Sequence, residues 1–165
     1  MTGQPSAPPS LTRALIGGAI AGAAAAAAMN GFQALVARVQ EDSGEGEPST
    51  VKAADALSEA VTGGPVAEPN RELAGRAVHY ATGVGLGVLY TTMAHHLSAV
   101  RSGWGTAYGL AAAAVLDEGL VPALGLGPKP TDTPPGTHVH SAASHTAFGL
   151  ALEAATWVLV GPAGE

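Results

Sequence analysis

The sequence has no cysteine, few aromatic residues and few charges. Its 165 residues are 4% aromatic and 12% charged, whereas 47% are hydrophobic. The absence of cysteine excludes disulfide scaffolds, thiolate metal sites and cysteine nucleophiles. A soluble domain usually carries about a quarter of charged residues, and half of that fraction cannot easily cover a water-exposed surface. The composition therefore predicts a small integral membrane protein whose main partner is the lipid bilayer.

The charges are also concentrated in one segment. Of the 20 charged residues, 12 lie between Arg38 and Arg76. The net charge of −6 provides no basic stripe that could neutralise phosphates. A nucleic-acid partner is therefore excluded.

Four apolar stretches predict four membrane spans, of which the first is followed by a long polar insert and the others are joined by short links. A helix rises about 1.5 Å per residue, so the first stretch is about 36 Å long and exceeds a hydrocarbon core of about 30 Å. Four spans with short links predict an all-α, four-helix transmembrane bundle of up-down-up-down topology, with both termini on one side. The spans are expected at about 14–37, 77–98, 103–126 and 141–161.

The remaining segments complete a single four-span domain over residues 11–161. Residues 1–10 form a Pro/Ser-rich leader that we expect to be flexible, and residues 162–165 form a tail. The polar insert 38–76 is predicted to contain a short amphipathic helix, which ends before Gly63. An alternative for the first span is a cleaved signal peptide, but the apolar run continues past the small-residue site where cleavage would occur.

Glycines recur at four-residue spacing within three of the predicted spans. In lipid, apolar surface does not drive helices together, so close backbone approach through small residues contributes much of the packing. Such faces could pack within the chain, or could join it to a second copy or to a partner membrane protein. The three pairs are Gly18/Gly22, Gly83/Gly87 and Gly105/Gly109.

The four-span topology brings titratable residues that are distant in sequence to one membrane face. An ionised carboxylate in hydrocarbon needs a partner, and imidazole rings are available as partners. We expect Glu153, about 12 Å deeper than His145, to act as a relay. The residues predicted to form a metal or proton site are His79, Asp117, Glu118, His140 and His145, and those in a secondary position are Tyr80, His138, Ser144 and Glu153.

Such a cluster supports three kinds of chemistry. It could bind a divalent or transition metal ion through imidazole nitrogen and carboxylate oxygen. It could store or pass protons, or it could lock helices together by hydrogen bonds. The spans contain neither an HExxH nor a di-iron ExxH motif, so the sequence favours a non-enzymatic site for a cation or protons. A metal-dependent membrane enzyme and an accessory subunit without chemistry remain the alternatives.

Three motifs in register resemble the bacterial YagU-like inner-membrane protein family, a domain of unknown function. The resemblance covers about residues 79–160. It implies a small multi-pass protein of the cytoplasmic membrane, and a suggested link of one member to acid tolerance is compatible with a histidine/carboxylate cluster. The motifs are His79-Tyr80-x3-Gly-x-Gly-x-Gly-x2-Tyr90, Asp117-Glu118-x3-Pro122-Ala-Leu-Gly-Leu126-x3-Pro130 and Ser144-His145-x2-Phe148-Gly149.

The orientation in the membrane stays open at this stage. The first and third loops carry five Lys or Arg residues, against Arg13 and Arg101 for the opposite side. The positive-inside rule would place those two loops in the cytoplasm. The family resemblance implies the reverse, with cytoplasmic termini.

Overall fold

The computed structural model describes residues 10–40, 47–94 and 96–161. Within these ranges every regular element is a helix, which confirms the predicted all-α class. The predicted tail and nearly all of the predicted leader lie outside the described residues.

Three long helices and one broken helix form the body of the protein. The long ones are α1 (Leu11–Gln40), α3 (Arg71–Ala94) and α6 (Pro135–Leu159). The broken one consists of α4 (Thr106–Val115), the π-helical turn η3 (Leu116–Leu120) and α5 (Val121–Ala123). The shorter elements are α2 (Ser49–Thr62), η1 (Glu68–Asn70), η2 (Ser98–Arg101) and η4 (Pro130–Asp132).

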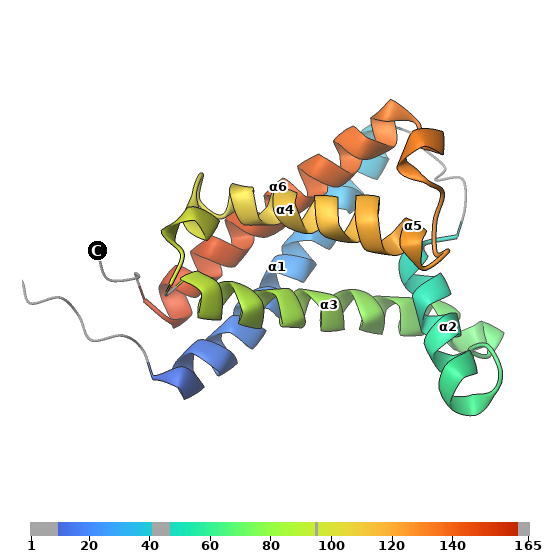
Figure 1. The fold of residues 1–165 in the computed structure, drawn as a ribbon, viewed down its shortest axis with the longest axis horizontal. Helices are drawn as coiled ribbons and strands as arrows, with labels where there is room; N and C mark the ends of the chain where they lie inside the picture. Colours follow the sequence, from blue (N-terminus) through green and yellow to red (C-terminus); the bar gives the residue numbers. More distant parts are fainter. Residues whose placement is uncertain (1–9, 41–46, 95, 162–165) are drawn as a thin grey trace, which may run out of the picture.

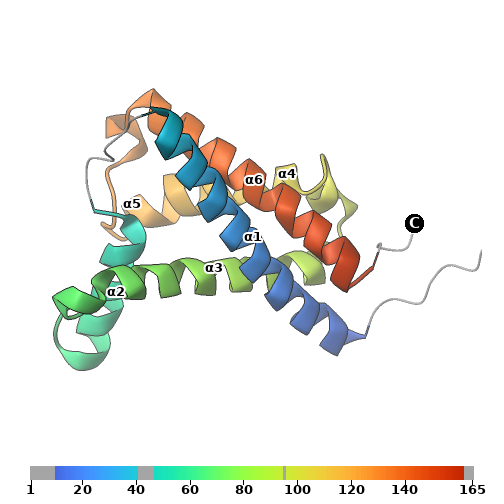
Figure 2. The ribbon, with the colours of Figure 1, turned by 180° about the vertical axis from the view of Figure 1, so that it is seen from behind.

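Successive long helices run in alternating directions (Figure 1). The start of α1 and the end of α6 lie at one end of the molecule, whereas α2 and the segment leading into α6 lie at the other. Figure 2 shows α1 alongside α6 and crossing α3. The α4 helix packs on the other side of α6. The predicted order of directions is therefore present in the fold.

Two glycine seams hold these helices together. A methyl carbon added at Gly87 of α3 would lie 2.7 Å from the backbone nitrogen of Gly22 in α1. The second seam joins α4 to α6, where a methyl carbon at Gly109 of α4 would lie 3.3 Å from the Cα atom of Gly149. Since even a methyl group is crowded at these sites, the small residues permit backbone-to-backbone contact.

Two tyrosines connect α3 and α4, which share no such seam. Tyr90 and Tyr108 are both buried, and their rings meet edge to face with centroids 4.9 Å apart. The Tyr108 hydroxyl donates a hydrogen bond of 2.8 Å to the carbonyl oxygen of Leu86. Together with alanines of α1 and Phe148 and Leu152 of α6, these rings make up the core.

The polar insert contains the short helix that the sequence predicts. Val51 and Ala54 of α2 are buried, and a methyl carbon at Gly75 of α3 would lie 2.6 Å from the Val51 side chain. Arg71 pairs with Asp55 across the two helices, and this hydrogen bond lowers the pKa of the Asp55 carboxyl group. The insert is therefore fixed to α3.

Two helix boundaries differ from the prediction. The expected loop before the fourth span is shorter, because α6 already begins at Pro135. Proline suits the first helical position, since its missing N–H would be unpaired there in any case. The expected third span is not one regular helix, because the π turn interrupts it.

One helix among the described residues is long and apolar enough to cross a membrane, and it covers Leu11–Val39. This finding rests on length and composition, and it supports an association with a membrane. The four-span bundle is not established by it. Glycine, threonine and histidine lower the hydropathy of the other helices, and α4 is only 10 residues long.

Candidate functional site

A π turn places two neighbouring carboxylates on the helix that follows α4. Pro122 has no N–H and its ring conflicts with the carbonyl group four residues earlier, so a regular helix cannot continue through it. The backbone forms a wider turn here, in which the N–H of Val121 donates a hydrogen bond to the carbonyl oxygen of Leu116, five residues earlier. Asp117 and Glu118 lie within this turn. Such turns frequently occur at functional sites.

The first pair joins Glu118 to His138 in the first turn of α6. The Glu118 Oε1 atom lies 2.6 Å from Nδ1 of the imidazole. The other ring nitrogen, Nε2, lies 3.2 Å from the carbonyl oxygen of Pro130. Both side chains are about one third exposed, at 34% and 33%, so the pair is in contact with solvent.

The partners of His138 determine where its protons belong. A carbonyl oxygen only accepts hydrogen bonds, and an ionised carboxylate also only accepts. The ring can therefore satisfy both partners only when both nitrogens carry protons and the ring is positively charged. Glu118 accordingly raises the pKa of His138 above its ordinary value of 6.5, mainly through this hydrogen bond.

The second pair joins Asp117 to His145 of α6, with a serine between them. The hydroxyl group of Ser141 donates a hydrogen bond to Asp117 Oδ2. The Nδ1 atom of His145 lies 3.6 Å from the same carboxylate oxygen and 3.2 Å from the carbonyl oxygen of Ser141. The His145 side chain is only 8% exposed and the Asp117 side chain is 37% exposed, so the ring of this pair is buried while its carboxylate is in contact with solvent.

Both acids therefore face α6. Residues 138, 141 and 145 share one side of that helix because their spacing follows its turns. Adjacent residues of a regular α-helix point about 100° apart, from which we expect only one of the two acids to face the bundle axis. The π turn changes this expectation, since both Asp117 and Glu118 reach the same neighbouring helix.

The structure does not bring the other predicted site residues to these pairs. His79 turns towards α1, where its Nε2 atom lies 3.4 Å from the carbonyl oxygen of Ala26. Tyr80 contacts the His79 ring edge on, with centroids 5.7 Å apart. His140 has no hydrogen bond or ion pair to any residue that the structure describes. Ser144 is completely buried, and its hydroxyl group lacks a partner among the described residues.

The predicted metal cluster is not supported. Among the described residues, no three His, Asp or Glu side chains are arranged so that they could hold a metal ion together. The reason lies in the local geometry, because each acid is already paired with one ring and His79 lies on a different helix surface. The site consists of two separate carboxylate–histidine pairs.

Glu153, which we expect to act as a relay, contacts a different set of residues from His145. Its carboxylate accepts hydrogen bonds from the Tyr90 hydroxyl group and from the Arg101 guanidinium group. The side chains of Glu153 and Arg101 are 9% and 19% exposed. The partner Arg101 is missing from the sequence-based site. The sequence does contain a signal for this partner. A buried acid requires a partner, and Arg101 is a basic residue in the short link between α3 and α4, at the same end of the bundle as Glu153.

The His138 pair makes the stability of the protein depend on pH. Because the pKa of His138 is raised in the folded state, its stabilising contribution is complete below pH 6.5 and is lost as the pH rises through the raised pKa. We expect Glu118→Gln to lower the unfolding temperature at acidic pH and to have little effect at alkaline pH. Unfolding temperatures between about pH 5.5 and 9 test this. The control is Glu72→Gln, which removes an exposed carboxylate and should show no such dependence on pH. If the unfolding temperatures of both variants change with pH in the same way, the Glu118–His138 pair is not the source of the effect.

The family comparison covers this part of the structure. The model of a family described as "Protein of unknown function (DUF1440)" matches residues 64–154, which is more than half of the chain. The chain belongs to the DUF1440 family. The DUF1440 segment contains both carboxylate–histidine pairs and the Arg101–Glu153 network, but neither α1 nor α2. Neither the search of curated proteins nor that of solved structures finds a match.

Proposed function

We propose that this DUF1440 protein is a multi-pass protein of the bacterial inner membrane that handles protons through its two carboxylate–histidine pairs. The single observation that carries the proposal is the position of His138 between two hydrogen-bond acceptors. The resemblance to the YagU-like family supports the cellular location.

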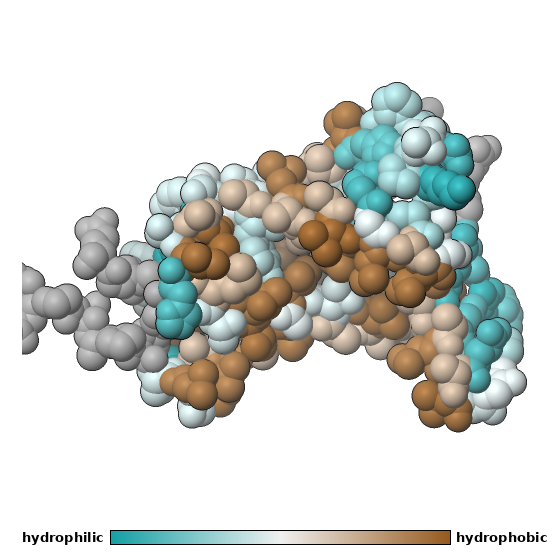
Figure 3. All heavy atoms as spheres, in the orientation of Figure 1, coloured by the Kyte–Doolittle hydropathy of each residue, from teal (hydrophilic) through white to brown (hydrophobic). Residues whose placement is uncertain are grey.

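The distribution of apolar side chains supports the membrane location. Large apolar residues are exposed on each of the long helices, and hydrophilic residues gather at one end, over α2 and the segment leading into α6 (Figure 3). Isolated exposed apolar residues are ordinary on a soluble protein, whereas a continuous apolar surface indicates contact with lipid or another protein. Examples are Ile16 and Ile20 of α1, Leu89 of α3, Leu110 of α4, and Leu150 and Trp157 of α6.

Proton uptake at the first pair has a simple course. Above the pKa of His138, the neutral ring donates a hydrogen bond from Nδ1–H to the Glu118 carboxylate, so the bare Nε2 atom faces the carbonyl oxygen of Pro130. One proton from the solvent then binds at Nε2, which replaces the repulsion between these two acceptors by a hydrogen bond and makes the bond to Glu118 charge-assisted. The pair gains one proton and one positive charge in this step. Its partial exposure keeps the exchange with water open.

The second pair and the Glu153 network extend the polar side of α6 inwards. His145 lies about 10 Å beyond His138 along the helix axis, and Glu153 about 12 Å beyond His145. Groups that can exchange protons are therefore present in both halves of the helix. A role confined to linking helices would give no reason for the outer pair to remain one third exposed.

Reconstitution into liposomes tests the proposal. The purified protein is placed in vesicles that contain a pH-sensitive dye, and the external pH is lowered while potassium and valinomycin compensate the charge. We expect the wild-type protein to acidify the lumen faster than protein-free vesicles, and Glu118→Gln and His138→Gln to abolish the increase. The matched control is Asp132→Asn, which neutralises an exposed acid in the segment just before α6.

The outcomes are distinct. Equal rates for wild-type and protein-free vesicles would overturn proton handling, as would an unchanged rate in both pair variants. Extraction of the protein from cells without detergent would overturn the membrane location.

A further inference from the structure

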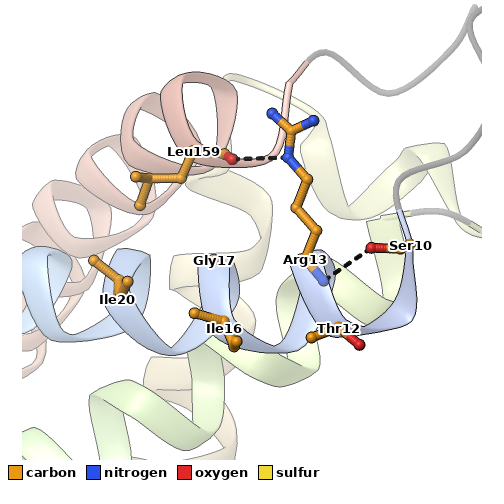
Figure 4. Close-up of a pocket in the computed structure, with 7 residues that line it drawn as sticks. All are labelled: Ser10, Thr12, Arg13, Ile16, Gly17, Ile20 and Leu159. Carbon is orange, nitrogen blue, oxygen red and sulfur yellow. Dashed lines mark hydrogen bonds between the residues drawn. The ribbon is translucent and has the colours of Figure 1, made fainter.

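A groove lies where the first turns of α1 meet the last turn of α6 (Figure 4). Its volume is about 320 Å³, and it is lined by Ser10, by Thr12, Arg13, Ile16, Gly17 and Ile20 of α1, and by Leu159 of α6. This groove is at the opposite end of the molecule from the carboxylate–histidine pairs. It is outside the matched DUF1440 segment, which ends at residue 154.

One end of the groove is positively charged. Arg13 donates a hydrogen bond of 3.2 Å from Nε to the carbonyl oxygen of Leu159, which holds the guanidinium group at the edge of the groove (Figure 4). No other described residue pairs with the two terminal nitrogens of that group. The N-terminus of α1, with its positive dipole end, lies beside it. Within the described part of the chain, the hydroxyl group of Ser10 accepts a hydrogen bond only from the backbone N–H of Arg13, at 3.3 Å.

The rest of the groove is apolar. Ile16 and Ile20 are 57% and 52% exposed and continue the surface from Arg13 along α1 for about 10 Å. Gly17 forms the floor between the helices, and a methyl carbon there would lie 2.5 Å from the Val160 side chain. The groove therefore combines a cationic end with an apolar wall about two helical turns long.

We propose that this groove binds an anionic phospholipid of the surrounding bilayer. The phosphate group contacts the terminal nitrogens of Arg13, and one acyl chain lies along Ile16 and Ile20. The proposal rests on the proposed membrane location. A guanidinium group offers a fork of N–H donors that matches phosphate oxygens, and the adjacent helix N-terminus also favours an anion. A lipid supplies both the charge and the apolar chain that these surfaces require.

Titration of lipid into the detergent-purified protein tests this site. The protein is prepared in an uncharged detergent, and its unfolding temperature is followed with added phosphatidylglycerol, phosphatidylcholine or inorganic phosphate. We expect phosphatidylglycerol to stabilise the wild-type protein most, and inorganic phosphate to have no effect. Arg13→Gln should weaken the apparent affinity for phosphatidylglycerol about tenfold, as the loss of one charge-assisted contact predicts. Ile16→Trp should weaken it as well, because the larger ring fills the groove while Arg13 stays in place.

Arg38→Gln is the matched control, because it removes another exposed arginine from the opposite end of the same helix. An equal loss of affinity in Arg38→Gln and Arg13→Gln would overturn the groove as the site and indicate general attraction of lipid to charge. Equal stabilisation by both lipids would overturn the preference for an anion, and stabilisation by inorganic phosphate would identify a phosphate site instead. These measurements are made in detergent, so their failure would overturn the lipid site and leave the membrane location intact. Extraction of the protein from cells without detergent would instead contradict the membrane location on which the lipid site rests.

Discussion

Replacing Arg101 by alanine is expected to lower the free energy of unfolding by about 3–5 kcal/mol, because it leaves a buried carboxylate without its cation. Glu153 and Arg101 are 9% and 19% exposed, and Tyr90 provides the one remaining hydrogen bond to that carboxylate among the described residues. The loss would be a large part of the roughly 5–15 kcal/mol by which a domain is usually stable. Thermal and denaturant unfolding in a mild detergent measures it.

Two further variants separate the buried charge from a general effect of arginine removal. Arg76→Ala breaks an exposed pair with Glu72, in which the side chains are 66% and 79% exposed, and should cost less than about 1 kcal/mol. The double variant Arg101→Met with Glu153→Gln removes both charges and retains an amide for Tyr90. It should regain most of the stability. If the double variant is as unstable as Arg101→Ala, the loss comes from packing and not from the unpaired charge.

Replacing Gly87 by alanine is expected to lower the free energy of unfolding by about 1–3 kcal/mol, although alanine is the better helix former. The added methyl carbon would lie 2.6 Å from the Cα atom of Gly22. Neither backbone can move away without separating α1 from α3, so the overpacking is not relieved by a side-chain rotation.

Gly85 provides the matched control, because it lies two residues earlier in the same helix with nothing within 4 Å of an added methyl carbon. Gly85→Ala should leave the stability unchanged or raise it by up to about 1 kcal/mol. The difference between the two unfolding temperatures measures the seam directly. Equal effects of the two substitutions would show that α1 and α3 do not cross at these glycines.

The sequence predicts the parts of the fold that follow from spacing within one helix. The glycine pairs at positions 18/22, 83/87 and 105/109 indicate close helix contacts, and the structure uses all three within the chain. The alternating directions of the helices follow from the short links. The sequence also predicts that the acids of the third span and the histidines near the start of the fourth lie near one membrane face, although it does not assign individual pairs.

The remaining features depend on interactions that spacing does not contain. The π turn arises because a regular α-helix cannot continue through Pro122. The turn brings the Glu118 side chain to His138, whereas in a regular helix Glu118 would point away from α6. Arg101 lies outside any apolar stretch, yet its long side chain reaches Glu153. His79 carries the same chemistry as the paired histidines, but a carbonyl group of α1 is nearer to it. The five residues predicted to form one cluster therefore do not come together in the structure. The spacing of residues along the chain does not specify which neighbour each side chain contacts.

The extra residue in the π turn gives a way to sort DUF1440 sequences. The glycine seam between α4 and α6 fixes the helix before the turn, and Pro122 fixes the chain after it. A homologue with one residue fewer between the glycine seam and the proline could form an uninterrupted α-helix there. Its α4 helix could still pack against α6 through the glycine seam. Its two acids would then diverge as ordinary helical neighbours do, and one imidazole would lose its counter-charge. A single-residue gap in an alignment at Gly119 would thus distinguish members with both pairs from members with one.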